Sequence, residues 1–357
     1  MLFDTNEIKL SSVYGGIPKN ISFFENEINT YNQDKNNSLK LMKTMGYKQH
    51  RLSINSTTFS EVAIDLFEQF LNKEKIGIDD VDAIITVSQI PDHFLPNMSS
   101  IIHGKLGLSK DTLCIDINDG CTGFIRGLML VSSLMKNKNI SNVVLLCGDM
   151  LSGKVSKKDR NSYPLIGDAV TLNFFQKRKS TSNKLPYGEI YHNGKSAKSL
   201  IIHAGGLKEP FTESSSKMIK DEDGNERSRE NLFMKGRDVF AFTQSTVASF
   251  LKEYYELAKK EDVKMIFSHQ ANEFIITRLR AKLGVDSEKF PSTVINKYGN
   301  SSSATIPMQI ADSCINHSKE INGKNVLVTG FGVGLSWAAA CLYISKKCTF
   351  NIFEGDY

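Results

Sequence analysis

The chain has 357 residues, of which 40% are hydrophobic, and its formal net charge is +5. This composition excludes a disordered or fibrous protein, and the length allows a large core in two domains or in one large duplicated domain. The charge is mild and forms no block of the kind that binds nucleic acid, and no apolar run approaches the roughly 18 residues of a membrane span.

The first residues, MLFDTNEIKL, lack the basic and then apolar layout of a signal peptide. The chain has six cysteines, at Cys114, Cys121, Cys147, Cys314, Cys341 and Cys348. No two of them have CxxC spacing, and most lie in apolar runs. We therefore expect no disulfide framework and no metal site, and we expect a cytoplasmic protein with reduced thiols.

In the first half, short apolar runs alternate with helical patterns, which indicates an α/β layered fold. Buried strands are predicted at 81–89, 112–118 and 142–149. Helices are predicted at 57–76, 96–108 and 121–135. Thr58 and Glu61 have the spacing of a capping box at the start of the first helix. The third helix is apolar on nearly every side, which predicts that it is buried.

The second half repeats this alternation. A helix is predicted at 234–260, a strand at 263–270, a helix at 272–284 and two closing strands within 324–345. The polar segment 176–230 is typical of a surface excursion and not of a separate domain. We therefore expect two halves, 1–195 and 196–357, each built as the same layered unit.

Cys121 lies between Gly120 and Gly123, where a strand pattern passes into a helical one. Amide donors and the positive end of a helix dipole lower the pKa of a thiol there and favour the nucleophilic thiolate. The two glycines allow a substrate to approach closely. The alternative is a small buried hydrophobic residue, which is what most single cysteines are.

Two further polar residues lie where patterns change. His269 ends an apolar strand in FSHQAN, a common place for catalytic side chains in α/β folds, although a capping histidine is the alternative. Asn300 lies in GNSSSATIP, a tight turn that can aim its side chain inward or merely cap a helix. The glycine turn at 330–337 is not a dinucleotide-binding fingerprint, because it joins two strand-like segments.

The motifs at Cys121, His269, Asn300 and 330–337 indicate a protein family more specifically together than any one of them does alone. Their order along the chain resembles that of β-ketoacyl-acyl-carrier-protein synthase III, the initiating condensing enzyme of the thiolase superfamily, from about residue 38 to 345. The segments IGDAV (166–170) and FMKGRDVFAF (233–242) also match the family. The resemblance implies a thiolase-like α/β fold of two duplicated halves, each a mixed sheet with helices, layered αβαβα.

The resemblance also implies a mechanism. Cys121 would attack an acyl thioester, and the amides of Cys121 and Val333 would form the oxyanion hole. A malonyl thioester would then lose carbon dioxide, while His269 and Asn300 donate hydrogen bonds to its thioester oxygen. The substrates would be thioesters of coenzyme A or acyl-carrier protein, with malonyl-acyl-carrier protein as second substrate, and no cofactor would be needed.

Substrate-binding residues follow from the same resemblance. Arg160 matches an arginine that stacks on adenine, and Gly236, Ala271 and Asn272 match positions along the pantetheine tunnel. Phe94 matches an aromatic residue that closes the acyl pocket of the partner subunit, so a homodimer is expected.

The chain departs from the family pattern near the tunnel entrance. Lys40 and Thr44 stand where the family has a Trp and an Arg, so one wall of the adenine site is missing, and Phe274 stands where the family often has a docking Arg. Arg278 and Lys282 lie four residues apart on a helix and form a basic patch suited to an acidic carrier protein, or an ordinary solvated face. These changes indicate a divergent paralogue with an unusual donor.

Two alternative functions stay open. One is an acyltransferase that passes the acyl group to a hydroxyl or amine without decarboxylation. The other is a non-catalytic subunit that binds acyl carriers, against which the intact Cys121, His269 and Asn300 weigh. Segment 86–100 contains no Glu and only Asp92, which weighs against the superfamily members that use a glutamate, the hydroxymethylglutaryl-coenzyme A synthases and the head-to-head condensing enzymes.

Overall fold

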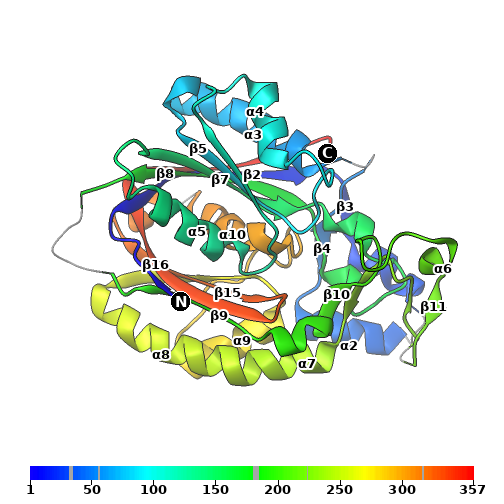
Figure 1. The fold of residues 1–357 in the computed structure, drawn as a ribbon. Helices are drawn as coiled ribbons and strands as arrows, with labels where there is room; N and C mark the ends of the chain where they lie inside the picture. The colour runs from blue at the N-terminus through cyan, green and yellow to red at the C-terminus, as the bar shows by residue number, and fades with distance from the viewer. Residues whose placement is uncertain (32–34, 55–56, 180–184, 223, 316) are drawn as a thin grey trace.

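The computed structural model describes residues 1–31, 35–54, 57–179, 185–222, 224–315 and 317–357. Helices and sheets alternate in layers, with helices outside both sheets and between them (Figure 1). The outer helices of the first half are α3 (Phe59–Glu74) and α4 (Met98–Leu106). Helices α5 (Gly123–Leu134) and α10 (Thr305–Cys314) lie between the sheets. The outer helices of the second half are α8 (Ala248–Ala258) and α9 (Glu273–Leu283).

The first sheet is mixed. Its strands are β2 (Ile8–Pro18), β8 (Ala169–Lys177), β7 (Asn142–Asp149), β5 (Ala83–Val87) and β6 (Leu113–Ile117), in that order. Strands β7, β5 and β6 are parallel to one another. Their carboxyl ends therefore meet at one edge, where α/β proteins commonly bind ligands.

The second sheet contains β14 (Val263–Ser268), β15 (Asn325–Gly332), β16 (Ser336–Gly355), β9 (Gly188–His192) and β1 (Leu2–Phe3). Strand β14 is parallel to β15. Strand β16 pairs with β15 and β9 through its first part and with β2 through its last part, so it runs through both sheets.

Shorter elements connect these layers. The helices among them are α1 (Phe24–Glu27), α2 (Lys35–Met45), α6 (Glu213–Ser216), α7 (Gly236–Phe242) and α11 (Ser318–Ile321). The strands are β3 (Ile21–Phe23), β4 (Gln49–Arg51), β10 (Leu200–Ile202), β11 (Ile219–Lys220), β12 (Glu226–Arg227) and β13 (Leu232–Met234). The remaining helical elements are short 3-10 segments and one π-helical turn among the described residues.

The strands and helices predicted in the first half are confirmed as β5, β6, β7, α3, α4 and α5. At the start of α3, the Thr58 amide donates to Glu61 Oε2 at 2.8 Å and the Glu61 amide donates to Thr58 Oγ1 at 3.4 Å, which confirms the capping box. Helix α5 is buried because it packs against both sheets, and Phe124, Ile125 and Leu128 contribute to the core between them.

The predictions for the second half are confirmed in outline. Strands β14, β15 and β16 and helix α9 lie in the expected segments. The long helix predicted at 234–260 begins at Gly236, and a π-helical turn at Thr243–Val247 separates α7 from α8. Single π turns inside α-helices are frequent at functional sites.

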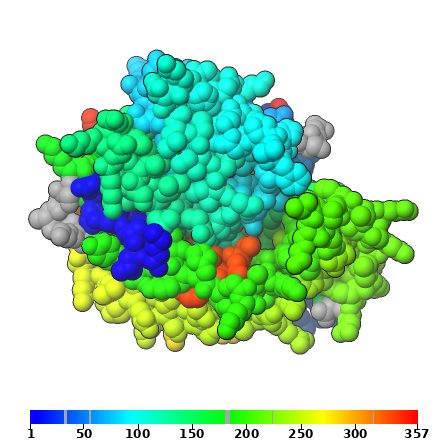
Figure 2. Space-filling view, in the orientation of Figure 1, coloured from blue at the N-terminus to red at the C-terminus, as the bar shows by residue number. Residues whose placement is uncertain are grey.

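The polar excursion at 176–230 contributes β9 to the second sheet and carries β10 and the β11–β12 pair, and β10 pairs with β13, which follows the excursion. Figure 2 shows part of it as a lobe at the side of the molecule. Residues 180–184 and 223 of this segment lie outside the described residues. The division of the chain at residue 195 stays a prediction. Strand β9 precedes residue 195 but pairs with β16, and β16 follows residue 195 but also pairs with β2.

Candidate active site

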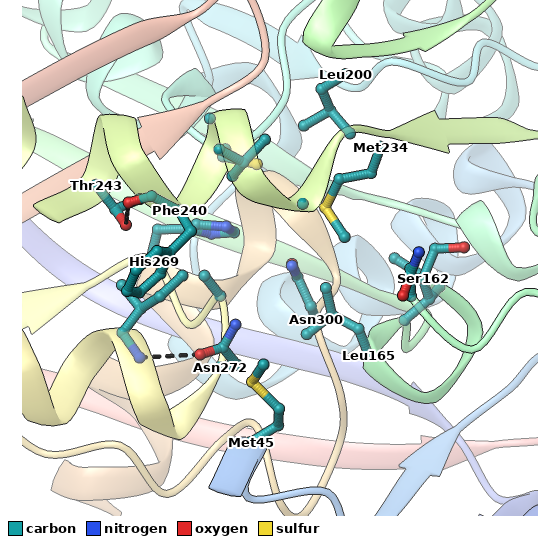
Figure 3. Close-up of a pocket in the computed structure, with 18 of the residues that line it drawn as sticks. Met45, Ser162, Leu165, Leu200, Met234, Phe240, Thr243, His269, Asn272 and Asn300 are labelled. Carbon is teal, nitrogen blue, oxygen red and sulfur yellow. Dashed lines mark hydrogen bonds between the residues drawn. The ribbon is translucent and has the colours of Figure 1, made fainter. Parts of the chain in front are cut away.

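The motifs that were far apart in the sequence meet at a cavity of about 520 Å³ (Figure 3). Nine of the predicted site residues line it, namely Cys121, Arg160, Gly236, His269, Ala271, Asn272, Arg278, Asn300 and Val333. In Figure 3, Phe240 and Thr243 lie on one side of the cavity and Ser162 and Leu165 on the other.

Both sheets bring their carboxyl edges to this cavity. Cys121 lies in the turn between β6 and α5, and His269 directly follows β14. Val333 lies in the turn between β15 and β16, and Asn300 lies shortly before α10. The two halves therefore share one site, with Cys121 from the first half and His269, Asn300 and Val333 from the second half.

Cys121 is buried, with 8% of its surface exposed. Its neighbour across the cavity is the backbone of Gly332, where an added Cβ would lie 2.5 Å from Cys121 Sγ. Burial raises the pKa of the thiol to about 12, and the negative charges of Asp119 and Asp149 add to this, although the amides of Val333 and Cys121 lower it. The prediction of a lowered pKa is therefore wrong for the resting protein, because the helix begins only at Gly123 and the surrounding chain excludes water.

His269 is 2% exposed, and its Nδ1 lies 2.7 Å from Thr305 Oγ1. The single hydroxyl hydrogen of Thr305 is donated to the Ser302 carbonyl oxygen at 2.8 Å, so Nδ1 carries the imidazole proton and donates to Thr305. Burial lowers the pKa of His269 to about 3. The ring is therefore neutral, and its Nε2 has a free lone pair.

Asn300 is fixed by its backbone and by its side chain. Its amide donates to Leu165 O at 2.7 Å, and its carbonyl oxygen accepts from the Gly167 amide at 3.1 Å. Its side-chain oxygen Oδ1 accepts from the Ser302 amide at 2.9 Å. This bond orients the side-chain amide so that Nδ2, a donor, is the group available to the cavity.

The charged side chains that line the cavity are Arg160, Arg237 and Arg278, and no Asp or Glu among the described residues joins them. The guanidinium of Arg278 lies 4.6 Å from the ring centre of Phe274, and Phe274 stacks on Phe240 with ring centres 5.5 Å apart. The cavity therefore presents positive charge beside apolar walls, an arrangement suited to an anionic ligand with an apolar part.

Other predicted residues lie elsewhere. Phe94 is 81% exposed and does not line the cavity of its own chain, and Lys282 is exposed on α9 outside the cavity. From α2, Leu41 and Met45 line the cavity, whereas Lys40 and Thr44 are exposed beside them.

The structure also brings residues to the site that the sequence did not single out. Gln89 and Ser302 line the cavity, and Asp149 is fully buried behind them. Gln89 follows β5, the parallel neighbour of the strand β6 that leads to Cys121, and Asp149 ends β7, which pairs in parallel with the other side of β5. Polar residues that directly follow predicted parallel strands are therefore a sequence signal for residues of the site.

All six cysteines are free. Among the residues with described positions, no cluster of three or more His, Cys, Asp or Glu side chains is arranged to hold a metal ion. No helix in the described segments has the length and apolar character needed to cross a membrane.

Two family models match the chain. The model for 3-oxoacyl-[acyl-carrier-protein (ACP)] synthase III matches residues 115–187, and the model for its C-terminal part matches residues 256–344. A β-ketoacyl-[acyl-carrier-protein] synthase III of Clostridium perfringens is 32% identical over 299 residues, which cover 83% of this chain and 88% of that protein. The chain belongs to the 3-oxoacyl-[acyl-carrier-protein] synthase III family.

Other members of the family agree in sequence and in structure. The corresponding synthase of Fusobacterium nucleatum is 31% identical over 300 residues, or 83% of this chain and 87% of that one. The crystal structure of a 3-oxoacyl-(acyl-carrier protein) synthase from Burkholderia xenovorans is 28% identical and superposes with a TM-score of 0.87, covering 98% of this chain and 99% of that one. This synthase III family member is therefore an acyl-transferring condensing enzyme with the thiolase-like fold.

Proposed function

We propose that this condensing enzyme receives an acyl group on Cys121 from a thioester and joins it to malonyl-acyl-carrier protein with loss of carbon dioxide. The observation that carries the proposal is the meeting of Cys121, a neutral His269 and Asn300 in one cavity whose charged lining is entirely arginine. The names of the relatives support acyl-carrier protein as the carrier.

In the first step, the free Nε2 of His269 accepts the thiol proton, and Sγ attacks the carbonyl carbon of the donor thioester. The negative charge that forms on the carbonyl oxygen is stabilised by the amides of Cys121 and Val333. In the resting site the same two amides lower the pKa of the thiol. The carbon–sulfur bond of the donor then breaks, its thiolate leaves, and the acyl group stays on Cys121.

In the second step, the bond between the malonyl carboxylate and its neighbouring carbon breaks and releases carbon dioxide. The resulting enolate oxygen accepts hydrogen bonds from Asn300 Nδ2 and from the now protonated Nε2 of His269. The enolate carbon attacks the acyl-cysteine, and the sulfur of Cys121 leaves and takes its proton back from His269. The β-ketoacyl product remains on the carrier.

The phosphate groups of the carriers fit the basic entrance. Phosphopantetheine is common to coenzyme A and acyl-carrier protein, and we assign its phosphate to Arg160, Arg237 and Arg278. Gly236, Ala271 and Asn272 would line its path to Cys121. We assign Arg278 and Lys282 to docking of the acidic carrier protein, and we propose no cofactor beyond these thioesters.

We further propose a homodimer in the cytoplasm. The side chains of Phe94 and Leu95 are 81% and 87% exposed, which is a large apolar surface for a single chain. A second copy would cover them and receive Phe94 at its acyl pocket. The six free cysteines favour a reducing compartment.

The two alternatives have less support. The relatives and neighbouring structures carry the names of synthases, which favours condensation over transfer to a hydroxyl or amine and over a non-catalytic subunit. No observation of the cavity favours either alternative.

Intact-protein mass spectrometry tests the proposed function. The protein is incubated with a panel of acyl-coenzyme A and acyl-carrier thioesters, with Cys121→Ala as the control, and then with malonyl-acyl-carrier protein. We expect an acyl adduct that requires Cys121 and is discharged as a β-ketoacyl product with release of carbon dioxide. An adduct that malonyl-acyl-carrier protein leaves in place would overturn the proposal in favour of the acyltransferase.

A further inference from the structure

We infer that Ser302 is a positioning residue of this site, which fixes His269 and Asn300 relative to Cys121 through an anchor formed by Gln89 and Asp149. The inference rests on the proposed function for the chemistry of these groups, but its contacts are properties of the fold. Ser302 begins the 3-10 turn before α10 and is 3% exposed.

The backbone of Ser302 contacts both catalytic side chains. Its amide donates to Asn300 Oδ1 at 2.9 Å. Its carbonyl oxygen accepts from Thr305 Oγ1 at 2.8 Å, and Thr305 Oγ1 in turn accepts from His269 Nδ1 at 2.7 Å. One peptide segment therefore determines which end of the Asn300 amide and which nitrogen of His269 remain available to a substrate.

The side chain of Ser302 is held by residues that follow strands of the first sheet. Gln89 Nε2 donates to Ser302 Oγ at 2.9 Å and to Asp149 Oδ2 at 3.1 Å. The Ser302 hydroxyl also lowers the pKa of the Asp149 carboxyl, which burial raises to about 6. With these bonds, both hydrogens of the Gln89 side-chain amide are used.

The anchor is itself rigid and lies against the turn of the nucleophile. Asp149 is 0% exposed and accepts from Ser88 Oγ at 2.6 Å and from the Gln89 amide at 2.7 Å. An ideal Cβ at Gly120 would lie 2.6 Å from Gln89 Oε1, so the Gln89 side chain packs directly on the residue before Cys121. Gln89 therefore contacts both Ser302 and the turn that holds Cys121, and it links the two.

The backbone conformation of Ser302 supports a positioning role. Its φ is +58°, in the left-handed region that residues other than glycine rarely adopt. At this position the Ser302 hydroxyl accepts the hydrogen bond from Gln89 Nε2, which helps to hold the strained backbone. Without the hydroxyl, the peptide would relax, and Asn300 and His269 would lose their fixed partners.

The chain offers a matched control, because three serines follow one another. Ser301 Oγ is buried and makes no hydrogen bond among the described residues. Ser303 Oγ donates to Val87 O at 3.1 Å and does not contact the anchor. Replacing each serine by alanine removes the same atom in the same turn, but only Ser302→Ala breaks the contacts to Gln89 and Asp149.

The test measures carbon dioxide release from malonyl-acyl-carrier protein by the full-length protein and by Ser301→Ala, Ser302→Ala, Gln89→Ala and the Ser302→Ala/Gln89→Ala double variant. We expect Ser302→Ala to lower kcat about 10- to 100-fold with little change in KM, as a small misplacement of reacting groups does. Gln89→Ala should have a similar effect, and the double variant should be no worse than either single variant, because the residues act as one unit. Ser301→Ala should retain wild-type kinetics.

A second readout does not depend on activity. Nitrogen-15 spectra of the histidine rings, with His269→Asn to assign the signal, should show an Nδ1-protonated ring in the wild type and in Ser301→Ala, and a mixture of tautomers in Ser302→Ala. An unchanged tautomer together with wild-type kcat in Ser302→Ala would overturn the inference, as would losses that add in the double variant. A wild type that releases no carbon dioxide overturns the proposed function instead, and the spectra then decide the role of Ser302.

Discussion

Cys121 and His269 lie in the same water-poor cavity, and burial shifts their ionisation in opposite directions. The pKa of the thiol rises to about 12 and that of the imidazole falls to about 3. Both groups are therefore neutral near pH 7, and a thiol stands beside a base without an ion pair. Transfer of the thiol proton from Cys121 to His269 becomes favourable only when the sulfur attacks a substrate carbonyl, which takes up the negative charge. Without a substrate the thiol stays protonated, and this protects it from side reactions.

The first prediction concerns the reactivity of Cys121. Because the pKa of the thiol is raised, we expect alkylation of Cys121 by iodoacetamide to be slow at pH 7 and to increase about tenfold per pH unit up to pH 9, without a plateau. Peptide-resolved mass spectrometry measures the rate, with the half-buried Cys114 as a reference within the same protein. If the alkylation rate reached a plateau below pH 8, the pKa of Cys121 would be lowered, as the sequence pattern predicted.

The second prediction concerns His269 and stability. In the unfolded chain its pKa is near 6.5, whereas in the folded protein it is about 3, so acidification protonates the unfolded state first. The free energy of unfolding should therefore fall as the pH drops below 6.5, and His269 should account for about 1 kcal/mol of the loss between pH 7.5 and 5.5. Urea unfolding of the wild type and of His269→Asn at both pH values measures this. Equal losses in the two proteins would contradict the assignment.

At the scale of elements, the end of β15 and the turn that follows it line the site beside Cys121. A Cβ on Gly332 would lie 2.5 Å from Cys121 Sγ and 2.6 Å from Cys121 Cβ. We predict that Gly332→Ala lowers the rate of acylation of Cys121 at least about 100-fold, because the reacting sulfur must move away from the oxyanion donors. Intact-mass measurement of the acyl adduct over time tests this.

Gly104→Ala is the control for that substitution, since no atom lies within 4 Å of an ideal Cβ at Gly104. It should acylate at the wild-type rate. An equal loss in both variants would mean that the effect of Gly332→Ala does not arise from its contact with Cys121.

Helix α3 provides a prediction that is independent of the site. Its capping box satisfies amide groups at the helix start, so Thr58→Ala should destabilise the fold by about 1 kcal/mol. Thr57→Ala removes only an exposed hydrogen bond to Ile54 and should change stability much less. Urea unfolding compares the two, and condensing activity at 25 °C should be unchanged in both. Equal destabilisation would show that the cap contributes nothing.

The sequence predicted elements well where the signal is local. The Thr58 cap, the apolar face of α3 and the all-apolar α5 are each encoded within a single segment. The π turn at Thr243–Val247 could not be predicted, because it contains no Gly or Pro. The pKa of Cys121 was missed for a related reason, since burial is imposed by distant segments such as the Gly332 turn.

At the scale of the whole molecule, the alternation of apolar runs and helical patterns indicated a layered α/β fold, and the resemblance added the αβαβα order of the layers. The sequence motifs predicted that Cys121, His269 and Asn300 act together, and the cavity contains all three. The anchor of Gln89 and Asp149 was not predicted, because its function is visible only when the ends of neighbouring strands are placed side by side. The closing strand was predicted only to residue 345, whereas β16 continues to Gly355 by pairing with a segment at the other end of the chain.

This last pairing has a consequence for the synthesis of the protein. Strand β2 pairs on one side with β8 and on the other with residues 344–355 of β16, which the ribosome makes long after β2. The first sheet therefore cannot be completed while the chain is being translated, even though most of its strands are already available. Until the end of β16 emerges, β2 presents an unpaired edge, and such edges attract other nascent chains.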